Sequence, residues 1–379
     1  MSTVIVTTQA ELDAALAASG WSEVRIRAEK RLRLVVGPTG DHDVILEGGT
    51  VQRVLQGGTV QEVWQGGTVQ RVWQGGTVQR VWQGGTVQRV LQGGTVQEVW
   101  QGGTVQRVWQ GGTVQRVWQG GTVQRVLQGG TVQEVLQGGT VQEVWQGGTV
   151  QEVLQGGTVQ RVLQGGTVQR VWQGGTVQEV LQGGTVQEVL QGGTVQEVWQ
   201  GGTVQEVLQG GTVQDLRGAS IVLRAESGAT IAKAGPWATI YVYGADVTVD
   251  GGRIIDLSGV NEEDAETWCE FQGVTVEDGH ALLYKAVNDD LKSERLFAYP
   301  VGETVICLDW TDDNECGGGL HVSPTPGTAH SYFERATRFL EVKVPLAELR
   351  PILGRVPKAK FRTGVVLREV TRDGGEVKA

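Results

Sequence analysis

Apolar and polar positions recur with a strict nine-residue period through the middle of the chain. Residues 48–209 read Gly-Gly-Thr-Val-Gln-x-Val-z-Gln eighteen times without an insertion, and an altered nineteenth unit covers residues 210–218. Position six (x) is Arg nine times and Glu nine times, and position eight (z) is Trp nine times and Leu nine times. Repetition at this period is typical of a β-solenoid, in which successive coils stack on one another.

The residue types of the unit predict a short strand and a turn. Two glycines per unit exclude a helix, since they would cost about 2 kcal/mol per unit relative to alanine. Thr and Val favour strands, so the segment from Thr to the last Gln is predicted to be extended and Gly-Gly to turn. Disorder is disfavoured because Val and Trp or Leu offer apolar surface at a fixed phase.

The order of the variable residues indicates how many units make one coil. The first four units read Arg/Leu, Glu/Trp, Arg/Trp, Arg/Trp and the next four repeat this order, whereas a later pattern returns after six units. Both shifts are multiples of two, so duplication of whole coils favours two units per coil over three. Nine such coils, spaced about 4.8 Å apart, would make a rod about 43 Å long.

Two side-chain registers are open for the repeat. A bend or bulge after the first Gln places both valines of a unit inside, for example Val51 and Val54. The unbulged alternative places Thr, Gln, Val and Gln inside as polar ladders. We favour the valine core. In either register the Arg/Glu and Trp/Leu positions face outward, because a buried unpaired charge is too costly.

The outward positions form the candidate interface. The first nine units carry seven Arg and two Glu and the last nine carry the reverse, so the rod is basic in one half and acidic in the other. A row of exposed Trp usually marks an interface, and an antiparallel partner would match basic and acidic halves. We therefore predict a lateral homodimer. Its candidate residues are Trp64, Trp82, Trp100 and Trp118 on one sheet and Arg53, Arg71, Arg89, Arg107 and Arg125 on the other.

Two other readings of this surface stay open. Trp and Leu can simply shield the sheet while the charges keep the rod in solution. An Arg ladder near Trp can also hold a nucleic-acid strand, but the acidic second half and the absence of Lys from the repeats disfavour nucleic acid as a partner.

The repeat block is flanked by segments that close its ends. Thr8 and Glu11 fit a capping box, so we predict a helix over residues 9–18 that covers the first coil, followed by strands at 23–28 and 31–36. The predicted division of the chain is a cap with the first coils (1–47), the repeat solenoid (48–218), irregular closing coils (219–260), an acidic linker or short helix (261–273) and an α+β domain (274–379).

The last hundred residues differ in kind from the repeats. They hold three of the four His, two of the three Cys and six of the eight Pro. Strands are expected at 280–287, 319–323, 337–344 and 364–371, with a helix at 326–335. A segment of this size can build its own core.

Three segments of this domain carry a family resemblance. GHALLYKAV (279–287), CGGGLHVSPTPGTAHSYF (316–333) and ATRFLEVKVPLAEL (336–349) resemble a domain family of unknown function in bacterial and phage proteins. Members of that family often carry the domain behind solenoid-like repeats rich in Thr, Val and Trp or Tyr. Those repeats are more varied and often shorter than nine residues, so the uniformity here implies recent expansion or deliberate regularisation. The resemblance implies no established activity.

Candidate chemistry in the domain is sparse. Tyr284, a Gly-Leu-His-Val-Ser-Pro-Thr segment and Glu341 follow the order of an ADP-ribosyltransferase, but no His-Gly-Thr or Glu-x-Glu motif occurs. The glycines 317–319 lack the Lys-Ser/Thr of a phosphate loop and fit a plain turn. An enzyme would need several polar residues to converge in one pocket: His280, Tyr284, His321, Ser323 or Glu341.

Metal binding and cofactors are not expected. The residue types suit Zn²⁺, yet no CxxC or HxxxH pair occurs among Cys307, Cys316, His321 and His330. A structural or interaction role is therefore favoured over an enzyme, with catalytic residues unknown. The net charge of −10 argues against a general nucleic-acid coat. The lack of an 18-residue apolar run, the lack of a secretory signal and an odd count of three cysteines favour a cytoplasmic protein with reduced thiols that does not enter membranes.

Overall fold

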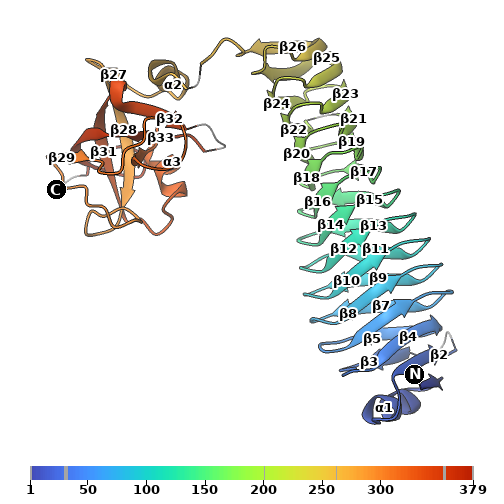
Figure 1. The fold of residues 1–379 in the computed structure, drawn as a ribbon. Coiled ribbons are helices and arrows are strands. Elements are labelled where there is room, and N and C mark those ends of the chain that lie inside the picture. The colour runs from blue at the N-terminus through green and yellow to red at the C-terminus, as the bar shows by residue number, and fades with distance from the viewer. Residues whose placement is uncertain (1, 30–32, 200, 262, 353–355, 378–379) are drawn as a thin grey trace. The chain divides into compact units, whose positions relative to one another are not determined.

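The chain folds into two compact units, Met1–Ser258 and Gly259–Ala379. We analysed a computed structural model, which describes residues 2–29, 33–199, 201–261, 263–352 and 356–377. The first unit is a parallel β-solenoid and the second is a small domain of antiparallel sheets (Figure 1). The predicted fold class, a mainly β solenoid with a separate C-terminal domain, is confirmed.

Each repeat forms one strand of the solenoid. The eighteen repeats give β5 (Thr50–Val54) to β22 (Thr203–Val207). Each strand begins at the threonine of its unit and ends at the second valine, or one residue later in β7, β9, β13 and β15. The altered unit gives β23 (Thr212–Leu216).

Pairing between strands confirms two units per coil. Every repeat strand pairs in parallel with the next strand but one, as β10 (Thr95–Val99) does with β12 (Thr113–Val117) through Thr95 and Thr113. Odd-numbered repeat strands therefore build one sheet of the flat coil and even-numbered strands build the other. Because partners lie eighteen residues apart, equivalent side chains stack from coil to coil.

The core of the rod is a double column of valines. Both valines of every unit are fully buried, from Val51 and Val54 to Val204 and Val207. The valine register is thus confirmed and the polar-ladder register is wrong. Two consecutive residues between the valines, such as Gln52 and Arg53, both remain partly accessible. This outward pair keeps the charged position out of the apolar interior, where it would be costly.

The turns explain both glycines of the unit. In the turn after β10, Gln101 and Gly102 have φ of 45° and 81°, and Gly103 N donates to Trp100 O at 2.9 Å. Positive φ at both central residues defines a type I′ turn. The second glycine has another role, because a Cβ on Gly103 would overlap the carbonyl oxygen of Val81 in the preceding coil. That oxygen already accepts from Trp100 N at 3.0 Å.

The N-terminal cap is a helix, as predicted. α1 (Gln9–Ala17) has a complete capping box between Thr8 and Glu11, and Leu12 is buried in the solenoid core. The first strands are β1 (Thr3–Val6), β2 (Glu23–Arg27), β3 (Arg33–Val36) and β4 (Asp43–Gly48). The strand expected at 31–36 is found from residue 33, and its first two positions lie outside the described residues. The sequence did not predict β1 and β4.

The closing coils continue the parallel ladder with less regular spacing. They consist of β24 (Ile221–Ala225), β25 (Thr230–Val242) and β26 (Thr248–Asp256). The pairing of β25 with β26 contains register shifts, whereas the repeat strands pair without any. The chain then enters the second unit.

The second unit contains two antiparallel sheets and two short α-helices among its described residues. The five-stranded sheet has the order β27-β28-β31-β34-β29 and the three-stranded sheet the order β30-β33-β32. The elements are α2 (Ala265–Phe271), β27 (Val276–Glu277), β28 (His280–Val287), β29 (Thr304–Ile306), β30 (Leu320–Val322), α3 (Pro326–Ser331), β31 (Arg338–Pro345), a 3-10 turn (Leu346–Glu348), β32 (Leu349–Ile352), β33 (Lys358–Phe361) and β34 (Thr363–Val370).

Several expected elements of this unit differ from the structure. The helix expected over 326–335 ends at Ser331, with Tyr332 as its C-cap. β29, β32 and β33 were not predicted. In the segment expected to be a linker or short helix, α2 forms, and its Trp268 and Cys269 are buried in the core of this unit.

We predict that Gly103→Ala destabilises the rod by about 1–3 kcal/mol, because the added Cβ displaces the Val81 carbonyl from its ladder bond. Urea denaturation followed by far-ultraviolet circular dichroism measures the loss. Gln101→Asn is the matched control in the same turn, since Asn tolerates the left-handed conformation. Equal stability of the two variants would contradict this role of the second glycine.

Candidate functional site

The Trp ladder predicted on one sheet of the rod is present. Trp64, Trp82, Trp100 and Trp118 stack in sequence, with ring centroids 5.5, 5.4 and 5.5 Å apart and interplanar angles of 11°, 9° and 15°. The sequence predicted exposed rings, but the rings are half-buried, because each indole covers a face of its neighbour. Offset stacking at this distance adds to the burial of apolar area.

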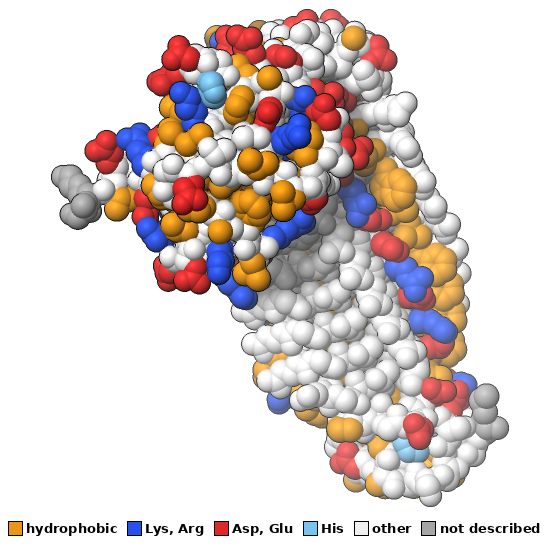
Figure 2. Space-filling model, turned by 60° about the vertical axis from the view of Figure 1, so that its left-hand side comes forward, with side chains coloured by type: hydrophobic (Ala, Val, Ile, Leu, Met, Phe, Trp, Pro, Cys, Tyr) orange, Lys and Arg blue, Asp and Glu red, His pale blue; other side chains and the backbone are white. Residues whose placement is uncertain are grey.

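The sheet that carries the Trp ladder also carries a ladder of alternating charge. Arg80 lies 3.1 Å from Glu62 and 4.0 Å from Glu98, and Arg116 lies 3.1 Å from Glu98. These pairs are solvent-exposed and individually weak. Their effect is to leave the strip beside the tryptophans without net charge. In Figure 2 a column of hydrophobic side chains runs along the rod beside a column of charged ones.

The Arg ladder lies on the other sheet. Arg71, Arg89, Arg107 and Arg125 are register partners from coil to coil. The ladder ends where Arg125 meets Glu143 at 3.3 Å. Among the residues that the structure describes, Arg53, Arg71, Arg89 and Arg107 have no ion pair. Because the two ladders lie on different sheets, contact through one sheet uses only one of them.

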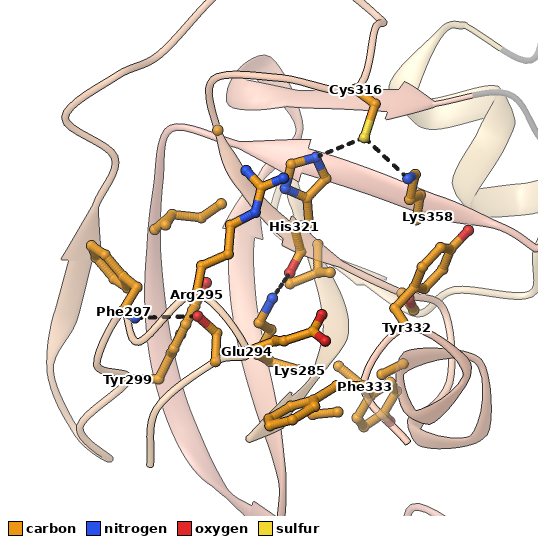
Figure 3. Close-up of a pocket in the computed structure, with 18 of the residues that line it drawn as sticks. Lys285, Glu294, Arg295, Phe297, Tyr299, Cys316, His321, Tyr332, Phe333 and Lys358 are labelled. Carbon is orange, nitrogen blue, oxygen red and sulfur yellow. Dashed lines mark hydrogen bonds between the residues drawn. The ribbon is translucent and has the colours of Figure 1, made fainter. Parts of the chain in front are cut away.

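A second candidate site is a cavity of about 340 Å³ in the C-terminal unit (Figure 3). β28 and β30 form part of its wall and the chain between β28 and β29 another part. Its polar and aromatic lining residues are Tyr284, Lys285, Ser293, Glu294, Arg295, Phe297, Tyr299, Asp309, Cys316, His321, Ser323, Tyr332, Phe333 and Lys358.

Cys316 lies between two nitrogen groups at the edge of this cavity. Lys358 Nζ donates to Cys316 Sγ at 3.2 Å, and His321 Nε2 lies 3.9 Å from the same sulfur. The intervening glycines serve packing, since a Cβ on Gly318 would overlap the Asp309 carbonyl oxygen and one on Gly319 would press on Lys360. They are the plain turn that the sequence favoured, and they bring Cys316 back toward β30.

The cavity has a positive electrostatic character. Burial and four neighbouring cations lower the pKa of His321 from 6.5 to about 4, so this imidazole is neutral at pH 7. The cations are Lys285, Lys358, Arg295 and Lys360. Burial, followed by Arg295, lowers the pKa of Lys285 to about 8, and Glu294 offsets this only in part. Lys285 Nζ donates to the backbone oxygen of His321 at 2.8 Å.

The structure brings together only some of the residues named from the sequence. Tyr284, His321 and Ser323 line the cavity, whereas His280 and Glu341 do not. Glu341 is buried and accepts from Arg368 Nε at 2.7 Å. Tyr284 Oη, from a residue that lines the cavity, also donates to Glu341 Oε1 at 3.5 Å, so Glu341 lies behind the cavity wall, in an ion pair with Arg368.

The four residues considered for zinc do not form one site. The thiol of Cys307 donates to Asp309 Oδ1 at 2.9 Å, and His330 lies against Phe339 and near Arg372. No group of three or more His, Cys, Asp or Glu side chains with metal-site geometry occurs within the described ranges. The sequence analysis missed Lys285, Arg295 and Lys358. The one signal in the sequence was the short spacing of Cys316 and His321, which indicated that these two side chains lie close together.

Comparison with known proteins identifies only the C-terminal unit. Residues 281–374 match the model of a family described as a domain of unknown function (DUF7666). No significant match was found among curated proteins or among solved structures. In the part of the chain that the structure describes, no helix is long and apolar enough to cross a membrane. The chain thus consists of a repetitive β-solenoid and a domain of unknown function.

We predict that the imidazole of His321 titrates near pH 4 and not near 6.5, measured by NMR on the full chain with His321→Gln for assignment. Between these pH values the unfolded chain binds a proton at His321 that the folded chain does not. The free energy of unfolding therefore falls as the pH falls through this window. Lys358→Met should raise the pKa, because it removes a neighbouring cation. A His321 pKa near 6.5 in the unmodified protein would contradict the burial of this side chain among cations.

Proposed function

We propose that the solenoid is a rigid scaffold or spacer that presents the C-terminal domain and associates laterally into an antiparallel homodimer through its Trp-bearing sheet. The observation that carries this proposal is the continuous stack Trp64–Trp82–Trp100–Trp118 beside a charge ladder with no net charge. A long apolar strip flanked by balanced charge is the type of surface that partners cover.

Rigidity follows from the uniform packing of the rod. The fully buried valines continue through every repeat, and backbone bonds link each coil to the next, in the turns as well as the strands. Gln101 N, for example, donates to Gln119 O at 2.9 Å. Because every repeat is packed in the same way, we expect the rod to keep a constant length, as a spacer requires.

The alternating charges favour an antiparallel arrangement over a parallel one. Along the Trp-bearing sheet the order is Glu62, Arg80, Glu98, Arg116. A two-fold axis between Arg80 and Glu98 places Glu62 opposite Arg116 of the second copy and Arg80 opposite Glu98 of the second copy. All four positions then face opposite charge, whereas parallel alignment places like charges together. Such an isologous contact also stacks Trp ladder on Trp ladder.

Matching the basic half of one rod with the acidic half of another requires a different alignment. Its two-fold axis would pass near Glu134, so that the tryptophans would mostly meet leucines. We favour the first alignment because it buries more aromatic surface and leaves no like-charged pair among its four positions. The second alignment is an alternative outcome of the tests below.

A second candidate function is an enzyme or effector domain displayed on the rod, which the cavity of the C-terminal unit favours.

The resemblance of the C-terminal segments to a bacterial and phage domain family further implies a bacterial or phage origin. We also propose a cytoplasmic setting, since all three cysteines are free thiols and Cys316 is exposed, a state typical of reducing compartments.

We predict that light scattering shows the full chain to be a dimer. Replacing Trp64, Trp82, Trp100 and Trp118 with Leu should raise the dissociation constant of this dimer at least about tenfold, because the contact loses aromatic area. Leu occupies the same position in nine of the repeats, so the variant keeps the coil intact. The matched control changes Trp73, Trp109 and Trp145 on the other sheet to Leu. A monomeric unmodified protein at both low and high salt would refute self-association.

Charge reversal tests the alignment. Arg80→Glu with Arg116→Glu makes the strip uniformly acidic, and Glu62→Arg with Glu98→Arg makes it uniformly basic. We expect each variant alone to be monomeric through like-charge repulsion and an equimolar mixture to form a heterodimer. Native mass spectrometry distinguishes the species. If both variants dimerise alone, the proposed alignment is wrong. If neither dimerises alone and mixing restores nothing, the alignment is likewise wrong.

A further inference from the structure

The cavity of the C-terminal unit contains more cationic than anionic side chains. None of its cations has a carboxylate at ion-pair distance among the described residues, although Arg295 acts on Asp309 and Glu294 on Lys285 at longer range. Lys285, Arg295 and Lys358 line it, against Glu294 and Asp309. Arg295 makes no hydrogen bond or ion pair with any residue that the structure describes. Lys285 donates only to a backbone oxygen. An unpaired guanidinium at a cavity wall attracts an anion from solution.

The walls suit an organic anion better than a bare inorganic one. Lys285 Nζ lies 5.3 Å from the ring centroid of Tyr299, and Lys358 Nζ lies 4.7 Å from that of Tyr332. Phe333 adds apolar surface at the lower side of the cavity in Figure 3. Apolar walls with a few convergent charged groups are typical of small-molecule sites, and a cavity of about 340 Å³ falls within their usual size.

The cavity also contains a thiol with the groups that nucleophilic sulfur requires. Lys358 donates to Cys316 Sγ at 3.2 Å, and His321 Nε2 is 3.9 Å away. A cation beside sulfur stabilises the anionic form, which is the nucleophile. In Figure 3 the guanidinium of Arg295 lies beside the His321 ring, so charge recognition and thiol share one cavity.

We propose that this cavity binds a small organic anion with an electrophilic carbon, and that Cys316 is the thiol that attacks it. Arg295 and Lys285 hold the anionic group, Lys358 stabilises the thiolate of Cys316, and the thiol proton passes to solvent water. The sulfur electron pair forms an S–C bond while the bond from that carbon to its leaving group breaks, and the leaving group departs with the bonding electrons. The proposal is independent of self-association by the rod.

The other two cysteines provide internal controls. Cys269 and Cys307 are both buried free thiols. Burial raises the pKa of Cys269 to about 11, and burial also raises the pKa of Cys307. Neither thiol faces the cavity, so each reports only general exposure of the fold to a reagent.

The experiment compares two alkylating probes on the full chain. Iodoacetate and iodoacetamide share the carbon and the iodide leaving group and differ in charge, so their rate ratio reports attraction of an anion. Peptide mass spectrometry gives the rate at each cysteine. We expect the iodoacetate-to-iodoacetamide ratio at Cys316 to exceed that of a free thiol such as glutathione by about tenfold. Cys269 and Cys307 should react far more slowly with both probes.

Variants of two lining residues separate their roles. Arg295→Met should lower the ratio toward that of glutathione, since it removes the anion-binding charge. Lys358→Met should slow both probes, because it removes the cation that stabilises the thiolate. Arg335→Met, an exposed residue outside the cavity, is the matched control and should leave both rates unchanged.

The outcomes either support or overturn the proposal. A ratio at Cys316 equal to that of glutathione, or one unchanged in Arg295→Met, would refute an anion site. An unchanged iodoacetamide rate in Lys358→Met would refute an activated thiol. Slow modification of Cys269 and Cys307 in each variant shows that the domain core remains folded, so a loss at Cys316 reflects the site.

Discussion

Close approach of the backbone at the second glycine of each repeat is the constraint on which the rod depends. At Gly103 the neighbouring coil leaves room for hydrogen alone, and the same contact recurs through the repeats. This approach lets turn and strand amides bond to the adjacent coil, which fixes the coil at eighteen residues. Fixed coil length in turn stacks valine on valine inside and identical side chains outside. The Trp and Arg ladders are therefore consequences of backbone packing.

The two sheets of the coil have different chemistry although their repeats are nearly identical. Over the first eight repeats, one sheet carries stacked indoles and balanced charge. The other sheet carries four consecutive arginines, Arg53 to Arg107, without ion pairs to described residues. Alternation between even and odd units is enough to produce this difference. The indole N–H groups of the stacked Trp are buried and have no acceptor among the residues that the structure describes. The gain in ring contact must exceed this cost.

Sequence reasoning predicted the rod well because one physical pattern repeats in it eighteen times. It missed β1 and β4, because neither segment carries the repeat pattern. In the C-terminal unit it found β28 and β31, which are long apolar strands, and it missed the short β32 and β33. The cavity was out of reach because Lys285, Arg295 and Lys358 are distant in sequence and only tertiary packing gathers them. Glu341 does not line the cavity, since its carboxylate pairs with Arg368 on the neighbouring strand β34.

The pairing of every strand with the next but one gives the rod a parity. Removing two repeats shortens it by one coil and leaves each remaining side chain on its own sheet. Removing one repeat leaves the remaining strands, turns and buried valines as they are, yet it transfers every repeat downstream of the deletion to the opposite sheet. A single-unit deletion after Trp82 would thus separate Trp100 and Trp118 from the first two rings. A stability measurement could therefore give the same value before and after the deletion of one repeat, although the side chains downstream had moved to the opposite sheet.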